Sequence, residues 1–170
     1  RERVSSRDQR RGIRSTTVPS MPAALDLLRR RFGTQTNEET IGPAAELASR
    51  GHQITALQRR QIRWTRAALT ACPLAAQRFL VAGHAPLIGH RCPQPELAAT
   101  LTRLAREGVD DFYQGGIAAA IVHDMGERGG LIDADDLAAV TARETVPIEI
   151  EWRGHRVVGV PPPGGGVQTL

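Results

Sequence analysis

Apolar residues recur at helical spacing along most of the chain and alternate with polar residues only near its end. The clearest helical stretch begins at Pro95 and ends at Gly108. Its apolar face follows the spacing i, i+3, i+4 and i+7, at Leu97, Thr100, Leu101 and Leu104. Proline is tolerated in the first turn of a helix and glycine is favoured just past its end, so this stretch predicts a well-delimited amphipathic helix.

The same signals predict further helices on both sides of it. Ser20 is expected to cap a helix that ends at Gly33, and Pro43 is expected to open a small-residue helix that ends at Gly51. Another helix is expected from Thr55 to just before Pro73. The remaining expected helices lie at residues 74–81, between the glycine pairs 115–116 and 129–130, and after residue 133, where three aspartates suit an N-terminal cap and first turn.

The pattern changes from helical to alternating close to the end of the chain. Ile148, Ile150 and Trp152 alternate with glutamates, and Arg153 and Gly154 mark a turn into a second alternating run. Three prolines and three glycines at residues 161–166 stop the pattern. The chain is therefore expected to be α+β and mostly helical, with a C-terminal strand hairpin.

The length of the chain fits a single domain with an arginine-rich connector before it. The 170 residues are 41% hydrophobic and 24% charged, and no apolar run reaches the roughly 20 residues that a membrane-spanning helix requires. Residues 1–18 have no helical or strand period and are assigned as the connector, and residues 19–170 as the domain.

The positive charge of the chain is concentrated at its start. The net charge is +4, and residues 1–14 carry six arginines against two acidic residues. The other 156 residues have 16 arginines, no lysine and 16 acidic residues. With aromatic residues at 4%, few bases could be stacked, so no nucleic-acid partner is expected.

The sequence shows no signature of a complete one-chain enzyme or of a bound cofactor. It has no nucleophile elbow, P-loop or dinucleotide fingerprint. The group His84, His90, Cys92 and Cys72 lacks zinc-ligand spacing, and the aspartates after residue 132 lack calcium-loop spacing, so no metal is expected. His123 is interpreted as a hydrogen-bonding residue at the edge of a helix. A disulfide between the two cysteines is left open, with free thiols as the alternative.

The segment Gly108–Leu137 resembles the large subunit of gamma-glutamyltranspeptidases. In that family a glycine is followed, after three residues, by Phe-Tyr-x-Gly, and this chain has Gly108 and then Phe112-Tyr113-Gln114-Gly115. The family continues with a helix, a Gly-Gly pair and an acidic helix start, which correspond here to Gly129-Gly130 and Asp133. The resemblance extends from about Thr17 to Leu170, with further matches in family order at residues 18–20, 32–33, 43–51, 94–101, 147, 153–154 and 161–163.

The resemblance implies a partial large-subunit domain of an N-terminal-nucleophile hydrolase, whose fold is an αββα sandwich. The family's precursor cleaves itself and exposes a threonine that attacks γ-glutamyl amides such as glutathione. That threonine is expected downstream of Leu170, in a small subunit of the same precursor, so this chain alone is expected to be inactive. The resemblance also implies a periplasmic or secreted protein, with a cytoplasmic one left open.

One substrate-binding residue is carried over from the resemblance. Family members have an Arg-Glu pair whose arginine holds the α-carboxylate of the substrate, and Arg1-Glu2 resembles it. Three alternatives are left open: a β-lactam acylase, a capsule-handling transpeptidase, and a non-enzymatic helical module whose basic tail contacts acidic partners.

Overall fold

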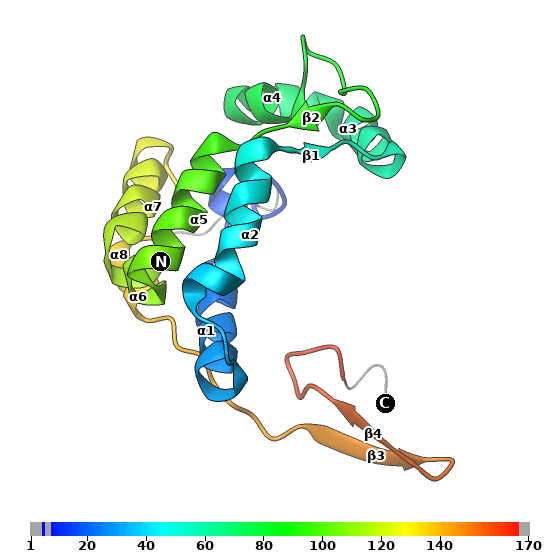
Figure 1. Cartoon of the computed structure of the whole chain (residues 1–170), viewed down its shortest axis with the longest axis vertical. Helices are drawn as coiled ribbons and strands as arrows, with labels where there is room; N and C mark the ends of the chain where they lie inside the picture. The colour runs from blue at the N-terminus through cyan, green and yellow to red at the C-terminus, as the bar shows by residue number, and fades with distance from the viewer. Residues whose placement is uncertain (1–4, 6–7, 167–170) are drawn as a thin grey trace. The chain divides into compact units, whose positions relative to one another are not determined.

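The computed structural model describes residue 5 and residues 8–166, and it divides the chain into two compact units. The first unit, Arg1–Val140, is helical. The second, Thr141–Leu170, contains a strand hairpin. Figure 1 shows the elements of both units along the chain. No helix in the described part of the chain is long and apolar enough to cross a membrane.

Most of the helices expected from the sequence are present in the first unit. Six of them confirm the predicted positions: α1 (Met21–Phe32), α3 (Ala56–Thr70), α4 (Pro73–Phe79), α5 (Pro95–Glu107), α7 (Gly116–Glu127) and α8 (Ala134–Ala138). Asp133 caps α8 as expected, because its side chain accepts from the backbone N–H of Asp136. A short 3₁₀ helix, Ile13–Ser15, precedes them.

The expected start of the second helix is wrong. Helix α2 spans Asn37–Arg50 and contains Pro43 in its interior. Thr36 and Glu39 form a capping box in which Thr36 Oγ1 accepts from the N–H of Glu39, and the Glu39 carboxylate accepts from the N–H of Thr36. Because these bonds satisfy backbone donors that would otherwise be unpaired, the helix begins in the polar stretch before Pro43.

The expected cap of α1 is also wrong, because the Ser20 side chain makes no capping hydrogen bond. The hydroxyl of Tyr113 takes its place: it accepts from the N–H of Ala23 at 3.2 Å and donates to the carbonyl of Pro19 at 2.8 Å. Tyr113 belongs to α6 (Val109–Gln114), a short helix where the sequence indicated only a break. A side chain 90 residues away therefore holds the start of α1.

A short strand pair that the sequence did not indicate connects the ends of α2 and α5. In it β1 (His52–Gln53) pairs antiparallel with β2 (Arg91–Cys92). Helices α3 and α4 lie in the chain between these strands. Figure 1 shows the four elements together at one end of the helical unit.

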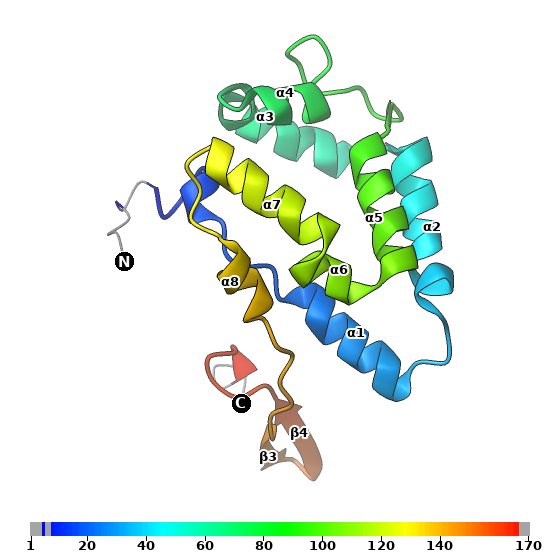
Figure 2. The same cartoon turned by 90° about the vertical axis from the view of Figure 1, so that its left-hand side faces the viewer.

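The core of the first unit lies around α6, α7 and α8. Its buried residues are Tyr113, Ala118, Met125, Ile132 and Leu137. Ile13 and Val18, from the stretch before α1, pack against this cluster. Helices α2 and α5 lie side by side next to it (Figure 2). The core therefore depends on the segment that resembles the gamma-glutamyltranspeptidase large subunit.

The second unit confirms the predicted hairpin. Strands β3 (Ile148–Trp152) and β4 (His155–Gly159) pair antiparallel, with Trp152 opposite His155. The two turn residues, Arg153 and Gly154, have φ of 50° and 76°. Positive φ at both central positions matches the right-handed twist of the strands, so this two-residue turn suits a tight hairpin.

Candidate functional site

A charged anchor joins α5, α6 and α7 at the glycine pair 115–116. Asp111 receives two hydrogen bonds from Arg103, with Nε donating to Oδ2 at 2.7 Å and Nη2 to Oδ1 at 2.8 Å. Its carboxylate also accepts from the N–H groups of Gly116 and Ile117, at 2.8 and 3.3 Å. These are donors at the start of α7, so Asp111 caps that helix and fixes its direction relative to α5.

The electrostatics of this anchor favour the ionised carboxylate. The Asp111 side chain is 10% exposed and that of Arg103 is 46% exposed. The hydrogen bonds from the Arg103 guanidinium, assisted by the Gly116 and Ile117 N–H groups, lower the pKa of Asp111 far below its usual range, although burial opposes the shift.

Close contacts at the anchor restrict a side chain at Gly115 more than at Gly116, where the nearest atoms belong to the flexible end of Arg103. A Cβ added at Gly115 would lie 2.8 Å from the Asp111 Cα, and one added at Gly116 would lie 2.6 Å from the Arg103 Cζ. Both distances are shorter than van der Waals contact. The Gly115-Gly116 pair, which the sequence predicted to precede a helix, is therefore the junction between α6 and α7 that contacts the Arg103–Asp111 ion pair.

Asp111→Asn is expected to lower the free energy of unfolding at neutral pH. It should also remove the part of that free energy that is lost in acid. The folded-state pKa is depressed, so the stabilisation by the carboxylate is complete above the unfolded pKa of about 3.9 and is lost as the pH falls below it. Urea unfolding followed by circular dichroism should show a gap between the parent and the variant that is constant above about pH 5 and narrows below about pH 4.

Asp124→Asn is the matched control, because its carboxylate pairs with Arg128 at a solvent-exposed position on α7. This substitution should change the unfolding midpoint much less than Asp111→Asn at every pH. Equal losses for the two variants at neutral pH would contradict the anchoring role of Asp111.

A cleft of about 540 Å³ adjoins the anchor, between α6, α7 and α8. Its walls are mostly small apolar residues, and its polar side chains are Tyr113, Gln114, His123 and Asp135. None of its lining residues is a serine, threonine, cysteine or lysine. The cleft therefore has groups that could hydrogen-bond a small molecule, but it has no alkyl hydroxyl, thiol or amine nucleophile.

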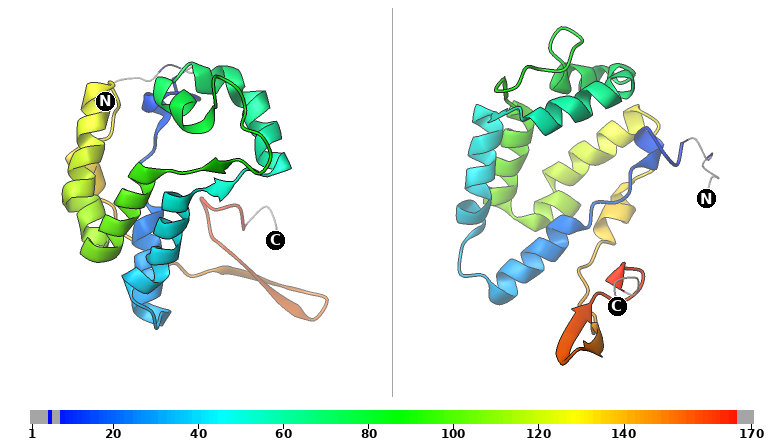
Figure 3. Two further views of the ribbon diagram at one scale, coloured as in Figure 1. Left: turned by 45° about the horizontal axis from the view of Figure 1, so that its top comes forward. Right: turned by 90° about the vertical axis from the view of Figure 1, so that its right-hand side faces the viewer.

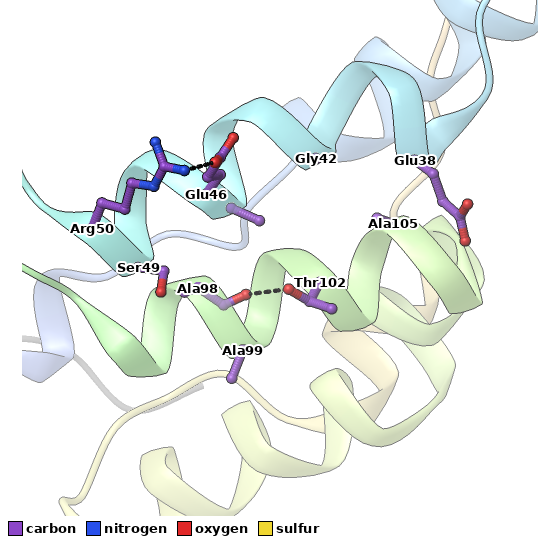
Figure 4. Close-up of a pocket in the computed structure, with 10 residues that line it drawn as sticks. Glu38, Gly42, Glu46, Ser49, Arg50, Ala98, Ala99, Thr102 and Ala105 are labelled. Carbon is purple, nitrogen blue, oxygen red and sulfur yellow. Dashed lines mark hydrogen bonds and ion pairs between the residues drawn. The ribbon is translucent and has the colours of Figure 1, made fainter.

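A second cleft, of about 430 Å³, runs between α2 and α5 and is shown in Figure 4. Small residues such as Ala45, Ala98 and Ala105 line it, and the Glu46–Arg50 ion pair lies at one side. The hydroxyl of Thr102 donates to the carbonyl of Ala98 within its own helix. Its carboxylates are Glu38 and Glu46, of which Glu46 is held by Arg50, and no histidine lines it.

The other residues considered from the sequence do not converge on one site. Arg1 lies outside the described residues. His84, His90 and Cys72 are exposed, Cys92 lies half-buried in β2, and both cysteines are free thiols. Within the described residues, no group of three or more His, Cys, Asp or Glu side chains is arranged to hold a metal ion.

The Arg103–Asp111 pair was missed in the sequence because its members lie eight residues apart, on either side of the Gly108 break. The feature of the sequence that could have indicated the pair is the presence of two acidic residues, Asp110 and Asp111, in what is the first turn of α6.

Comparison with known proteins places these elements in a family. Residues 1–170 match the family described as gamma-glutamyltranspeptidase. The chain is 32% identical over 157 residues to a glutathione hydrolase proenzyme of Pseudomonas sp. strain A14, covering 91% of this chain and 27% of that protein. It is 34% identical over 152 residues to the acylase ACY 1 proenzyme of Pseudomonas sp. strain SE83, covering 89% of this chain and 27% of that protein.

The solved structures give the same result. The crystal structure of Helicobacter pylori gamma-glutamyltranspeptidase superposes with a TM-score of 0.90 at 27% identity, covering 96% of this chain and 47% of that one. The chain thus spans about a quarter of the length of the two curated relatives and about half of the solved chain. The chain belongs to the gamma-glutamyltranspeptidase family.

Proposed function

We propose that this chain is the large-subunit part of an enzyme that cleaves γ-glutamyl amide bonds of the glutathione type and transfers the acyl group to water or amino acids. The observation that carries the proposal is the family match across residues 1–170, together with 32% identity to a glutathione hydrolase proenzyme.

The chain acts as a scaffold in this proposal. Leu25, Leu28 and Phe32 on α1 are 57%, 55% and 71% exposed, which leaves an apolar face that the remainder of the protein would cover. Hairpin β3–β4 pairs with no other strand among the described residues. A two-stranded hairpin is marginal by itself, so we place it in the central sheet of an αββα sandwich completed by the small subunit.

Catalysis is assigned to a threonine downstream of Leu170. After self-cleavage of the precursor, its hydroxyl attacks the γ-glutamyl carbonyl, and its freed α-amine accepts the hydroxyl proton. Neither cleft described above provides this pair of groups. Arg1 is proposed to hold the α-carboxylate of the substrate, because a planar guanidinium can grip a carboxylate through two hydrogen bonds.

The second candidate function is acylase activity on β-lactam side chains. The 34% identity to the acylase ACY 1 proenzyme supports this function as well as the 32% identity to the glutathione hydrolase proenzyme supports the first. The two functions differ in the acyl group that the enzyme accepts, because a γ-glutamyl donor has an α-amino group that a simple dicarboxylic side chain lacks.

The decisive experiment expresses the complete reading frame that contains this chain. The purified precursor should split into two bands on a denaturing gel and then hydrolyse a γ-glutamyl anilide, whereas residues 1–170 alone should produce no turnover. Replacement of the first threonine of the new small subunit by alanine should abolish both events. In the mature enzyme, Arg1→Gln should raise KM for the anilide.

Two outcomes would contradict the proposal. Turnover by residues 1–170 alone would contradict the missing nucleophile. A self-cleaved protein that removes the acyl side chain of a β-lactam and does not act on the anilide would replace the first function with the acylase.

A further inference from the structure

The middle of the chain carries a second concentration of positive charge, which the overall balance after residue 14 conceals. Between Gly51 and Pro95 there is no aspartate or glutamate, while Glu46 precedes this stretch and Glu96 follows it. The stretch contains six arginines: Arg59, Arg60, Arg63, Arg66, Arg78 and Arg91. It therefore has a charge of +6, higher than that of the whole chain.

The fold gathers this stretch into one structural region, which we call the basic lobe: residues 51–95, comprising β1, α3, α4, β2 and the loop before β2. Figure 3 shows these elements together at one end of the helical unit. Four of the arginines lie on α3, where 3.6 residues per turn places them within roughly one third of the helix circumference. Arg60, Arg63 and Arg66 are exposed.

The arginine stripe has no counter-charge of its own. None of the four α3 arginines forms an ion pair with an acidic residue in the part of the chain that the structure describes. Elsewhere exposed arginines such as Arg50 and Arg128 pair with a glutamate or aspartate one helical turn away. An acid-free stripe on a helix instead creates a positive potential that attracts an anionic partner.

Exposed apolar residues lie along both margins of this stripe. On one side Trp64 is 75% exposed, with the Arg60 guanidinium 5.1 Å from its ring centroid, and Leu57 is 53% exposed. On the other side Arg59 Nη1 donates to the Pro86 carbonyl at 2.9 Å, which ties the loop to α3. The next two loop residues, Leu87 and Ile88, are 70% and 63% exposed.

We propose that the basic lobe docks on a membrane surface rich in anionic phospholipid. Helix α3 would lie along the surface with its arginines against the headgroups, and Trp64, Leu87 and Ile88 would enter the interfacial layer. Basic helices with exposed tryptophan and leucine bind such surfaces through electrostatic attraction and shallow apolar burial. A nucleic acid accounts less well for the two exposed aliphatic residues, because bases stack on aromatic rings and, among the described residues, Trp64 is the aromatic side chain recorded against a stripe arginine.

The test uses Trp64 fluorescence in the 170-residue chain with Trp152→Phe, so that a single tryptophan reports. Vesicles of phosphatidylcholine mixed with phosphatidylglycerol should shift its emission to shorter wavelength and pure phosphatidylcholine should not. Added salt should reverse the shift. The triple variant Arg60→Gln, Arg63→Gln and Arg66→Gln should lower the vesicle partition coefficient by roughly 100-fold.

Two further variants test whether the basic lobe is the part of the chain that binds the vesicles. Arg106→Gln, Arg128→Gln and Arg143→Gln remove the same charge from outside the lobe and should leave partitioning almost unchanged. A double variant of the loop, Leu87→Ser and Ile88→Ser, should weaken partitioning without touching α3, which keeps the test valid if the arginine variant fails to fold.

Three results would overturn the proposal. The first is equal loss of partitioning in both triple variants. The second is loss of partitioning on Arg10→Gln and Arg11→Gln with none in the lobe variants, which would assign the binding to the N-terminal arginines. The third is a Trp64 response to duplex DNA with no response to anionic vesicles.

Discussion

Replacing Leu137 by alanine is expected to lower the free energy of unfolding by about 2–5 kcal/mol. Leu137 is 0% exposed and is the largest fully buried side chain among the described residues. It lies on α8, and it packs in the core cluster with Tyr113, Ala118 and Met125 from α6 and α7. Removing its branched end leaves a cavity against α6 and α7, which the Asp111 anchor fixes relative to each other, so the space cannot close easily.

Leu131→Ala is the matched control, because Leu131 is 41% exposed and lies only six residues away. Urea unfolding of both variants, followed by circular dichroism, should give a large shift in midpoint for Leu137→Ala and a small one for Leu131→Ala. Similar shifts would show that the cluster around α8 is not the core of this unit.

Replacing Gly51 by alanine is the second substitution expected to have a large effect. Gly51 ends α2 with φ 76° and ψ 141°, a conformation that L-residues other than glycine rarely adopt and whose cost is about 1–3 kcal/mol. An added Cβ would also lie 2.6 Å from the Pro93 nitrogen and 2.7 Å from the Cys92 carbonyl carbon. Both are backbone atoms, so relief requires the β1–β2 pair to move relative to α2.

Gly42→Ala is the control for this substitution. Gly42 lies inside α2, and a Cβ there would meet no atom within 4 Å apart from its chain neighbours and the backbone of its own helix. Alanine at this position should change the stability little, because the better helix propensity of alanine is offset by the clash of its Cβ with the ring of the following Pro43. Thermal unfolding should therefore give a lower Tm for Gly51→Ala and an almost unchanged Tm for Gly42→Ala. A Gly51→Ala variant as stable as the parent would contradict the geometry assigned to this turn.

These two substitutions also bear on the proposed function. Gly51 and Leu137 lie in the two regions where the chain follows the gamma-glutamyltranspeptidase pattern, Pro43–Gly51 and Gly108–Leu137. In a large-subunit scaffold, their effect on activity should come through folding and maturation of the precursor. We therefore expect each variant to lose yield of the cleaved form before it loses affinity for substrate.

The charged anchor shows why the candidate site was only partly predictable. The Gly115-Gly116 break, the apolar helix after it and the Asp133 cap were all visible as local patterns, since each depends on residues within a few positions. The pairing of Arg103 with Asp111 depends on the direction in which α6 leaves α5 at Gly108. The spacing of residues along the chain does not predict that direction, so the sequence did not indicate that Arg103 and Asp111 form an ion pair.

The elements that could be predicted from the sequence are those whose causes are local. Helical periodicity with proline and glycine at the ends located α5, alternation with a two-residue turn located the β3–β4 hairpin, and ordered motifs identified the family. These features follow from backbone preferences and side-chain spacing, which act over a few residues.

The features that join distant residues became evident in the folded chain. It showed that Tyr113, and not Ser20, holds the start of α1, and that His52 and Cys92 face each other in a strand pair. It also gathered the acid-free stretch between Gly51 and Pro95 into one lobe. The physical reason is common to all three: a hydrogen bond or a surface potential depends on distance in space, and packing of the helices sets that distance.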